Sequence, residues 1–269
     1  MRMKTVKGVT LVELLVGMAV GMILLGSIYM AINVAQRSTS GIERKVTAQQ
    51  DIKPALNLMA MEIGMASYNP SYTSGLWLSV SLNPTTCTVS TNQNYKGIQE
   101  ATSNSIVVEM DITNTPDASG NCTATDGNGS LSDCNEIIRY EYLSGTTDLR
   151  ITREIIRYNA TAAPPTTTSG AQPFLGTSDA DVASGNPRTV RVINNTAGTG
   201  NTALPVFRYY DGTGTELFPT TANQAPIPNI RRVEITIAVE TEDIDPNTQQ
   251  RRRLIYSTSV IPRNHAIIP

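Results

Sequence analysis

The sequence predicts an α+β protein in which one long N-terminal helix packs on an antiparallel β-sheet. Two observations carry this prediction. An apolar run over residues 9–35 continues into residues 36–67, where apolar side chains recur at helical spacing. The remainder, residues 68–269, holds short alternating runs rich in β-branched residues and separated by turn-forming residues. A helix and a sheet that each have one apolar face bury those faces against each other.

The apolar run over residues 9–35 is long enough to span a membrane. It holds 27 mostly apolar residues and a single charge, Glu13, whereas a spanning helix needs about 20 residues. Residues 1–8 carry three cations and no acid, and cations beside a membrane helix favour the cytoplasmic side. The sequence therefore predicts a membrane helix whose N-terminus lies in the cytoplasm.

Glu13 is unexpected in such a helix. A charged side chain at the centre of a membrane helix costs about 2.5–3.5 kcal/mol on insertion scales unless it is paired or neutralised. Two simpler interpretations compete: an anchor helix with a stray acid, and a secretory signal peptide. A signal peptide has an apolar run of about 7–15 residues followed by a small-residue cleavage site. The run here is longer and lacks that site.

The residues around Glu13 resemble a known processing signal. The stretch Lys7-Gly8-Val9-Thr10-Leu11-Val12-Glu13-Leu14 is similar to the class III signal of type IV prepilins and type II secretion pseudopilins. The resemblance implies that a prepilin peptidase cleaves between Gly8 and Val9 and methylates the new N-terminus at Val9. Glu13 is then the fifth residue of the mature chain. The family usually has Phe or Met where this chain has Val9.

An acid at this position has a physical use in an assembly of parallel helices. After cleavage each subunit carries a cationic amine at Val9, and Glu13 of an adjacent, staggered subunit can pair with it, which removes the cost of two isolated charges. The resemblance implies other pilins, minor and major, as partners through the N-terminal helix, together with the prepilin peptidase and the inner membrane. Gly17, Gly21 and Gly26 fit either close packing in a filament or the ordinary glycine content of membrane helices.

The helix is expected to continue beyond the membrane through residues 36–67. One apolar face is predicted from spacings of three and four residues, formed by Ile52, Leu56, Met59, Ile63 and Ala66. Ser67, Asn69 and Pro70 then end the pattern. Pro54 lies inside this stretch and predicts a kink, because proline removes a backbone hydrogen bond and clashes with the preceding turn.

The region after the helix is predicted to be β-rich. In residues 232–240 every second residue is apolar, and residues 251–261 are the expected partner strand after a turn. Residues 136–143 and 148–157 predict a second hairpin. Residues 160–186, rich in Pro, Thr, Ser and Gly, predict a loop-rich insertion. Further strands are predicted at residues 105–112, 190–193 and 205–210.

Three segments after the membrane helix resemble PilW-like minor pilins. They are residues 49–68 (QQDIKPALNLMAMEIGMASY), residues 206–212 (VFRYYDG) and the final hairpin (RRVEITIAVET, then RRRLIYSTSVIPRN). By this resemblance the J pseudopilin of type II secretion is a near relative and the fold is pilin-like. The implied division is a prepilin leader (1–8), a transmembrane and filament-core helix (9–35), its amphipathic continuation (36–67) and a periplasmic β-rich head (68–269).

Charge and residue content argue against several function classes. The formal charge is −2, and without the leader it is −5, with 18 basic against 23 acidic residues. The sequence has no basic run suited to nucleic acid, so no such partner is expected. The only histidine, His265, is expected to be solvated in a polar tail, and no serine or cysteine forms a local nucleophile motif with it. We therefore predict neither an enzyme nor a cofactor.

No metal site is predicted either. Cysteine and histidine do not occur at zinc-binding spacing. Residues 126–130 begin with the alternating oxygen ligands of a calcium loop, but the sixth position is Leu131 and not Gly, and the twelfth is Ile137 and not Glu. The segment is therefore interpreted as a polar turn.

Three cysteines suit an exported domain with at most one internal disulfide. Cys122 and Cys134 are the favoured pair, because the segment between them has many turn-forming residues and almost no apolar residue to hold it by packing. A crosslink closing a loop of this size stabilises a fold by about 3 kcal/mol in the chain-entropy model. Pairing of Cys87 with either of the others stays open on sequence alone.

The sequence is thus interpreted as a minor pilin, a structural subunit of the initiation or tip complex of a type IV pilus. Its expected location is the inner membrane with a periplasmic head, and later the pilus at the cell surface. One alternative is a pseudopilin of a type II secretion tip complex. A second alternative, of a different class, is an adhesin or binding module that uses the helix only for display.

Overall fold

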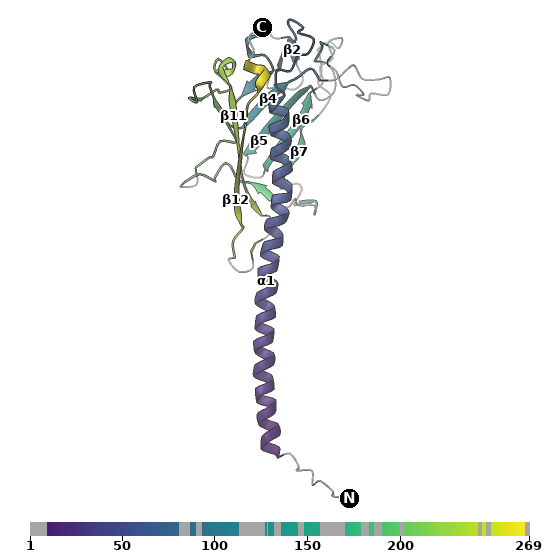
Figure 1. Ribbon diagram of the computed structural model, residues 1–269, viewed down its shortest axis with the longest axis vertical. Coiled ribbons are helices and arrows are strands. Elements are labelled where there is room, and N and C mark those ends of the chain that lie inside the picture. Colours follow the sequence, from purple (N-terminus) through teal and green to yellow (C-terminus); the bar gives the residue numbers. More distant parts are fainter. Residues whose placement is uncertain are drawn as a thin grey trace, which may run out of the picture.

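The structure is a computed structural model of the chain, in which a β-rich head sits at one end of a single long helix (Figure 1). The residues that it describes are 10–80, 87–89, 93–112, 127, 129–131, 136–144, 148–156, 170–178, 183–185, 190–199, 202–241, 244–245 and 249–266. The predicted cleavage junction at Gly8 and Val9 lies outside these residues, as do Cys122 and Cys134. The processing site and the disulfide therefore stay predictions.

Helix α1 (Leu11–Gly64) is continuous over 54 residues. Thr10 is its N-cap, and the helix ends at Met65, whose backbone N–H donates to carbonyls of the last turn. Pro54 lies on an exposed side of α1, and the helix continues through it as one ribbon (Figure 1). The prediction of one long N-terminal helix is confirmed.

The part of α1 nearest the head buries one face. The buried residues there include Ala48, Ile52, Ala55, Leu56, Met59 and Ile63. These positions repeat every three or four residues, which keeps them on one side of a helix with 3.6 residues per turn. The predicted apolar face is therefore the face that packs on the head.

Two five-stranded antiparallel sheets form the head. The first has the order β3 (Ile98–Ala101), β4 (Ser105–Glu109), β5 (Ile137–Ser144), β6 (Asp148–Ile156) and β7 (Gln172–Ser178). The second has the order β10 (Glu216–Leu217), β9 (Phe207–Tyr210), β11 (Arg232–Thr241) and β12 (Arg253–Val260), with β8 (Val190–Val192) also pairing with β11. The remaining elements are the pair β1 (Leu78–Val80) and β2 (Cys87–Val89) and the 3₁₀ turns η1 (Gln93–Tyr95), η2 (Ile227–Asn229) and η3 (Arg263–Ala266).

Helix α1 lies between the two sheets, with β11 and β12 on one side and β6 and β7 on the other (Figure 1). One apolar core joins all three parts. It contains Met59 and Ile63 from α1, Tyr140 and Ile151 from the first sheet, and Phe207, Val233 and Ile237 from the second. This arrangement confirms the predicted α+β fold, with two main sheets where the sequence predicted one.

Both predicted hairpins are confirmed. β5 pairs with β6 from Ile137↔Ile156 to Ser144↔Leu149, and β11 pairs with β12 from Val233↔Val260 to Glu240↔Arg253. In β11 the predicted inward residues are buried, because alternate side chains of a strand point to the same face. The predicted strand at residues 105–112 is shorter, as β4, and it is buried on both faces. Val107 packs in a second apolar cluster with Trp77 and Ile137.

The prediction of a loop-rich insertion over residues 160–186 is wrong for residues 172–178. These form β7, which pairs with β6 despite a register irregularity. The strand was hard to recognise because Pro173 and Gly176 break its alternation. Gly176 has φ +97°, and a Cβ there would lie 2.4 Å from the carbonyl oxygen of Leu149, so this position requires glycine.

The prediction that His265 is solvated is also wrong. His265 is 2% exposed, with Nδ1 3.0 Å from Ser67 Oγ and Nε2 2.9 Å from the carbonyl oxygen of Ile227. The carbonyl can only accept, so Nε2 carries the hydrogen and Nδ1 accepts from the Ser67 hydroxyl. Ser67 Oγ in turn accepts the Gly97 N–H at 2.9 Å. The C-terminal segment thus closes over the end of α1, which a local sequence pattern cannot reveal.

Candidate functional site

The half of α1 that projects away from the head is an uncovered apolar surface (Figure 1). No residue from Leu11 to Ala35 is buried against the part of the head that the structure describes. Within the described residues, α1 is the one helix long and apolar enough to cross a membrane. Apolar surface of this extent requires a cover, either lipid or other helices.

Glu13 lies at the N-terminus of this surface and caps its own helix. Its Oε2 accepts the Thr10 backbone N–H at 2.9 Å and the Thr10 hydroxyl at 3.0 Å, while the Glu13 N–H donates to Thr10 Oγ1 at 3.3 Å. This is a capping box, in which Ser or Thr at the N-cap and Glu or Gln three residues later satisfy each other's backbone groups.

The capping role of Thr10 was missed in the sequence, although the Thr-x-x-Glu spacing carries that signal. Both contacts that Glu13 accepts end on Oε2, and among the described residues no partner reaches Oε1. A single carboxylate can accept about four hydrogen bonds. Capping within the chain is therefore compatible with a second contact to a cation outside it.

The three glycines of the apolar half have no packing role within the described chain. Nothing lies within 4 Å of the position that a Cβ would take at Gly17, Gly21 or Gly26. Any contact that benefits from their small size must come from another molecule. In membranes, small residues let helix backbones approach closely.

A buried ion pair fixes α1 to the first sheet. Glu62 on α1 accepts from Arg153 of β6 through two bonds, Nε to Oε2 at 3.1 Å and Nη2 to Oε1 at 2.6 Å, and from the Tyr140 hydroxyl of β5. Burial, and then the charge of Glu62, raise the pKa of Tyr140, so its hydroxyl stays a donor. A bidentate pair of this kind fixes orientation as well as distance.

The β11–β12 hairpin braces α1 below the head. The Arg44 guanidinium donates to the carbonyl oxygen of Ile244, and Arg252 Nε lies 2.8 Å from Asp245 Oδ2. Arg252 and Asp245 sit against Gly41, 3.5 and 3.6 Å from the position of a Cβ there. Together with Glu62, these contacts hold the exposed half of α1 in a defined direction relative to the head.

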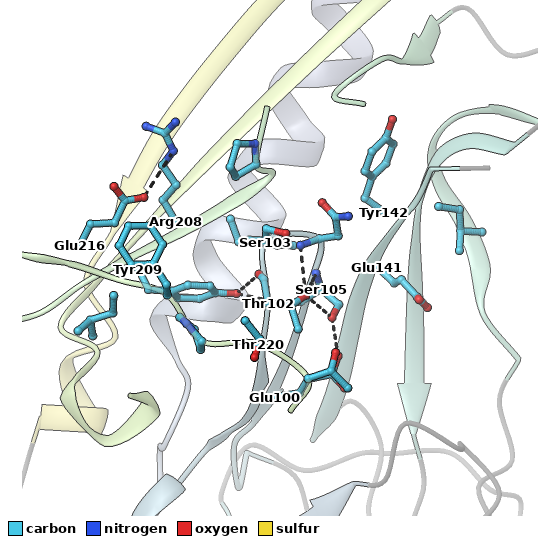
Figure 2. A pocket seen from close by; sticks show the side chains of 18 residues that line it. Glu100, Thr102, Ser103, Ser105, Glu141, Tyr142, Arg208, Tyr209, Glu216 and Thr220 are labelled. Atoms are coloured by element: carbon cyan, nitrogen blue, oxygen red, sulfur yellow. Dashed lines mark hydrogen bonds and ion pairs between the residues drawn. The ribbon is translucent and has the colours of Figure 1, made fainter. Parts of the chain in front are cut away.

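A cleft of about 650 Å³ with both polar and apolar lining residues opens between the two main sheets (Figure 2). Its volume falls in the range of roughly 300–1,000 Å³ typical of small-molecule sites. Its lining includes three carboxylates, Glu100, Glu141 and Glu216, and one guanidinium, Arg208, which lies 3.7 Å from Glu216. The other lining residues include hydroxyl and amide side chains and a short apolar wall, among them Thr102, Ser103, Asn104, Ser105, Leu217, Phe218 and Thr220.

The polar groups at the floor of the cleft are already engaged. The Tyr209 hydroxyl donates to the carbonyl oxygen of Thr102 at 2.8 Å, and burial raises its pKa well above the ordinary value. Glu100 accepts from the Ser105 hydroxyl and lies 3.2 Å from an Arg139 nitrogen. Two of the lining carboxylates thus lie next to guanidinium groups, Glu100 next to Arg139 and Glu216 next to Arg208, and the cleft fits a small polar ligand.

Within the described residues, no group of three or more His, Cys, Asp and Glu side chains could hold a metal ion. Among the site residues predicted from the sequence, Glu13 is the one that the structure describes, and it lies at the capped start of α1. Gly8, Val9, Cys122 and Cys134 lie outside the residues it describes.

Comparison with known proteins finds a match at the N-terminus. Residues 3–29 match the model of the prokaryotic N-terminal methylation motif. Neither a curated protein nor a solved structure matches the chain significantly. The motif and the exposed apolar helix that carries it support a prepilin-like protein of the type IV pilin or pseudopilin kind. They also support anchoring in a membrane through α1.

Proposed function

We propose that the protein is a minor pilin, a non-enzymatic subunit that initiates a type IV pilus or sits at its tip. The observation that carries the proposal is the uncovered apolar half of α1, with Glu13 at its capped N-terminus and a methylation motif over the same residues. Such a helix packs beside the equivalent helices of other subunits. The broad head, with its two sheets, favours a tip position over a densely packed shaft.

In this proposal the prepilin peptidase removes residues 1–8 while the head lies in the periplasm. The new amine at Val9 then pairs with Glu13 of a neighbouring subunit, and Oε1 is the oxygen available for it. The similarity of the later segments to PilW-like minor pilins supports the same assignment. The alternative within this class is a pseudopilin related to the J subunit of a type II secretion tip complex. The amount of the protein in sheared pili distinguishes the two.

The first prediction separates the charge of Glu13 from its capping role. Glu13→Gln keeps a capping-box residue but removes the charge, whereas Thr10→Ala removes the cap and keeps the charge. Without the Glu13 charge, the ammonium group of a neighbouring Val9 stays unpaired in an apolar setting, which is unfavourable. The amount of Glu13→Gln or Glu13→Ala in sheared pili should therefore be at least about tenfold lower than that of the unaltered protein. Thr10→Ala should enter at near-normal levels. The measurement is immunodetection of the protein in the pilus and membrane fractions.

Membrane content is the control for this prediction. Both Glu13 variants should insert at least as well as the unaltered protein, because a charge is removed from the apolar helix. Normal incorporation of Glu13→Gln together with poor incorporation of Glu13→Ala and Thr10→Ala would mean that Glu13 acts only as a cap.

The cleft between the sheets favours a second candidate, a binding module displayed at the membrane or the pilus tip. Its volume and its hydroxyl, amide and charged lining residues suit a small polar ligand. A ligand screen on the full-length protein, with Glu216→Gln and Arg208→Met as paired variants, tests this candidate. Saturable binding that both variants weaken would support it, and binding unaffected by either variant would place the ligand elsewhere.

A further inference from the structure

The outer edge of β12 is open, whereas the other sheet edges in the described part of the head are short or closed. On β3, the Gln224 side chain makes the two hydrogen bonds that a neighbouring strand would make to Ala101. Its Oε1 accepts the Ala101 N–H at 2.9 Å, and its Nε2 donates to the Ala101 carbonyl at 3.2 Å. The β7 edge is interrupted by Pro173 and Gly176, while β8 and β10 have three and two residues. Proteins protect sheet edges in these ways because an open edge pairs with other chains.

The register of the final hairpin shows which groups of β12 face outward. Thr241 N–H donates to the Arg252 carbonyl at 3.0 Å, so Thr241 and Arg252 form a hydrogen-bonded pair that continues the register of β11 and β12. Every second residue from Arg252 onward therefore directs its backbone groups towards β11. Alternate residues of an edge strand therefore point their N–H and C=O groups away from the sheet. In β12 these residues are Arg253, Ile255, Ser257 and Ser259, all of them exposed.

Between Ile255 and Ser259 the strand has none of the sequence features that usually prevent an edge from pairing with another chain. The residues are Ile-Tyr-Ser-Thr-Ser, without a charge, a proline or a glycine. Among the described residues, nothing pairs with the outward backbone groups of these positions. Arg253, the one charged residue of β12, is the first residue of the strand, and its Nε lies 2.6 Å from Glu240 Oε1.

Helix α1 runs beside this strand. β12 follows α1 in the same direction, with Arg252 against Gly41 and Val260 against Gly64. Ile42 and Val46 are 59% and 45% exposed. With 100° per residue they lie about 100–140° around the helix axis from Gly41, the residue that Arg252 contacts, so they flank the side of α1 that carries β12.

We propose that an extended segment of a neighbouring pilin-like subunit adds a strand to the outer edge of β12. In such β-augmentation the main chain supplies the hydrogen bonds and alternate side chains fill adjacent pockets. One set of side chains of the added strand continues the side of β12 that carries Leu254, Tyr256 and Val260, which pack against the core, so these residues are expected to be apolar. The other set lies beside Ile255 and the two serines. The proposal rests on the proposed function, because it takes the neighbour from the same assembly.

A second copy of the same edge is not the partner. Antiparallel pairing of two β12 edges would also turn the two α1 helices in opposite directions, since β12 follows α1. Subunits anchored in one membrane have parallel helices, so this pairing is unavailable to them. Parallel pairing of two β12 edges is excluded as well. In a parallel pair each hydrogen-bonded residue bonds two different residues of the other strand, so the two strands are not equivalent and cannot be related by a two-fold axis.

The test compares the full-length protein purified in detergent with the same protein in isolated filaments. In detergent, the amides of Ile255, Ser257 and Ser259 should exchange with solvent rapidly, while those of Tyr256 and Thr258 are protected by β11. In filaments the first set should gain at least about tenfold protection, the equivalent of roughly 1.4 kcal/mol. Protection of the outward amides already in detergent, or no gain in filaments, would overturn the proposal.

Variants at the edge give an independent readout. Ser257→Pro removes one outward N–H at a position where an edge strand tolerates proline, and Ser257→Ala is its matched control. Ser257→Pro should reduce recovery in filaments about tenfold, whereas Ser257→Ala should not. If Ser257→Pro fails to fold, as judged by its thermal unfolding, Ile255→Lys takes its place, because an edge lysine opposes strand addition.

The two proposals fail in distinguishable ways. If Glu13→Gln abolishes incorporation but Ser257→Pro and Ile255→Lys incorporate normally, the edge proposal is wrong and the minor-pilin proposal stands. A photo-crosslinker at Ser259 should join the protein to a strand of a different subunit. Crosslinks between two β12 strands would instead contradict the choice of partner.

Discussion

Thr10 and Glu13 together determine how α1 begins. The capping box satisfies backbone groups that a helix start leaves without partners, and loss of an N-cap residue typically costs about 1 kcal/mol. The same carboxylate keeps Oε1 for a second partner. A residue that looks costly in a membrane helix thus has one role within its own chain and, in our proposal, another at the contact between chains.

A buried histidine makes the stability of the head depend on pH. Burial lowers the pKa of His265 to about 4, from an ordinary value of 6.5. Between these values the unfolded chain binds more protons than the folded chain, so stability falls as pH falls. The contribution of the neutral imidazole is complete above pH 6.5 and is lost as pH drops towards 4. We expect a loss of about 3 kcal/mol, measured by denaturant unfolding from pH 7 to pH 4.

Carboxylates also titrate in this range, so a variant is needed to isolate the histidine. His265→Gln offers a donor and an acceptor without a titrating group. The difference in unfolding free energy between the two proteins should shrink steadily from pH 6.5 to pH 4. A difference that does not change with pH would mean that His265 is not a buried neutral base.

The ion pair between α1 and the first sheet is expected to show the asymmetry of buried charges. Arg153→Met leaves Glu62, 6% exposed, with a single hydroxyl partner. We expect a destabilisation of about 3 kcal/mol in denaturant unfolding, because breaking a buried pair leaves an uncompensated charge. Glu62→Gln combined with Arg153→Met should recover more than half of that loss. Equal destabilisation by the single and double variants would contradict this account.

At the scale of elements, α1 is one helix with two environments. Its half nearest the head gains stability from packing, whereas its projecting half has no packing partner within the described chain. Two sets of contacts join the halves to the head: Glu62 with Arg153, and the hairpin residues that reach Gly41 and Arg44. Contacts of this kind fix the direction of the projecting half of α1 relative to the head.

Alanine substitutions at two glycines, Gly41 on α1 and Gly97 next to Ser67, should change the stability of the protein in opposite directions. A Cβ at Gly41 would meet its nearest neighbour at an ordinary 3.5 Å, so Gly41→Ala should stabilise the protein by about 0.5–1 kcal/mol through helix propensity. A Cβ at Gly97 would lie 2.2 Å from the Ser67 nitrogen and 2.4 Å from the Glu109 oxygen. Gly97→Ala should therefore destabilise it by about 1–3 kcal/mol or more. Thermal unfolding of both variants checks the signs, and a stabilising Gly97→Ala would refute the packing described here.

Local patterns made some of these elements predictable and left others hidden. The apolar face of α1 and the alternation in β11 repeat within a few residues, so the sequence predicted both. β7 was missed because Pro173 and Gly176 interrupt its pattern, and the burial of His265 depends on Ser67, almost 200 positions earlier. Contacts of that separation leave no local signal. The same holds for Glu62 and Arg153, whose pairing requires the helix and the sheet to be placed first.

At the scale of the whole molecule, the arrangement of the head and the helix suits the proposed assembly in one direction. The apolar half of α1 projects beyond the head, and both the hairpin brace and the open edge of β12 lie alongside α1 (Figure 1). Lateral contacts of the head would then form in step with contacts of the helix. The cleft between the sheets adds a surface that assembly through α1 does not use.

The central claim is that the protein is a processed prepilin, and its mature N-terminus tests this most directly. Intact-mass analysis and N-terminal peptide sequencing of the membrane form should find a chain that begins at Val9, eight residues shorter than the full sequence. The same spectrum reports whether Val9 carries a methyl group. A mature chain that begins near residue 30 would show an ordinary secretory signal and would contradict the account.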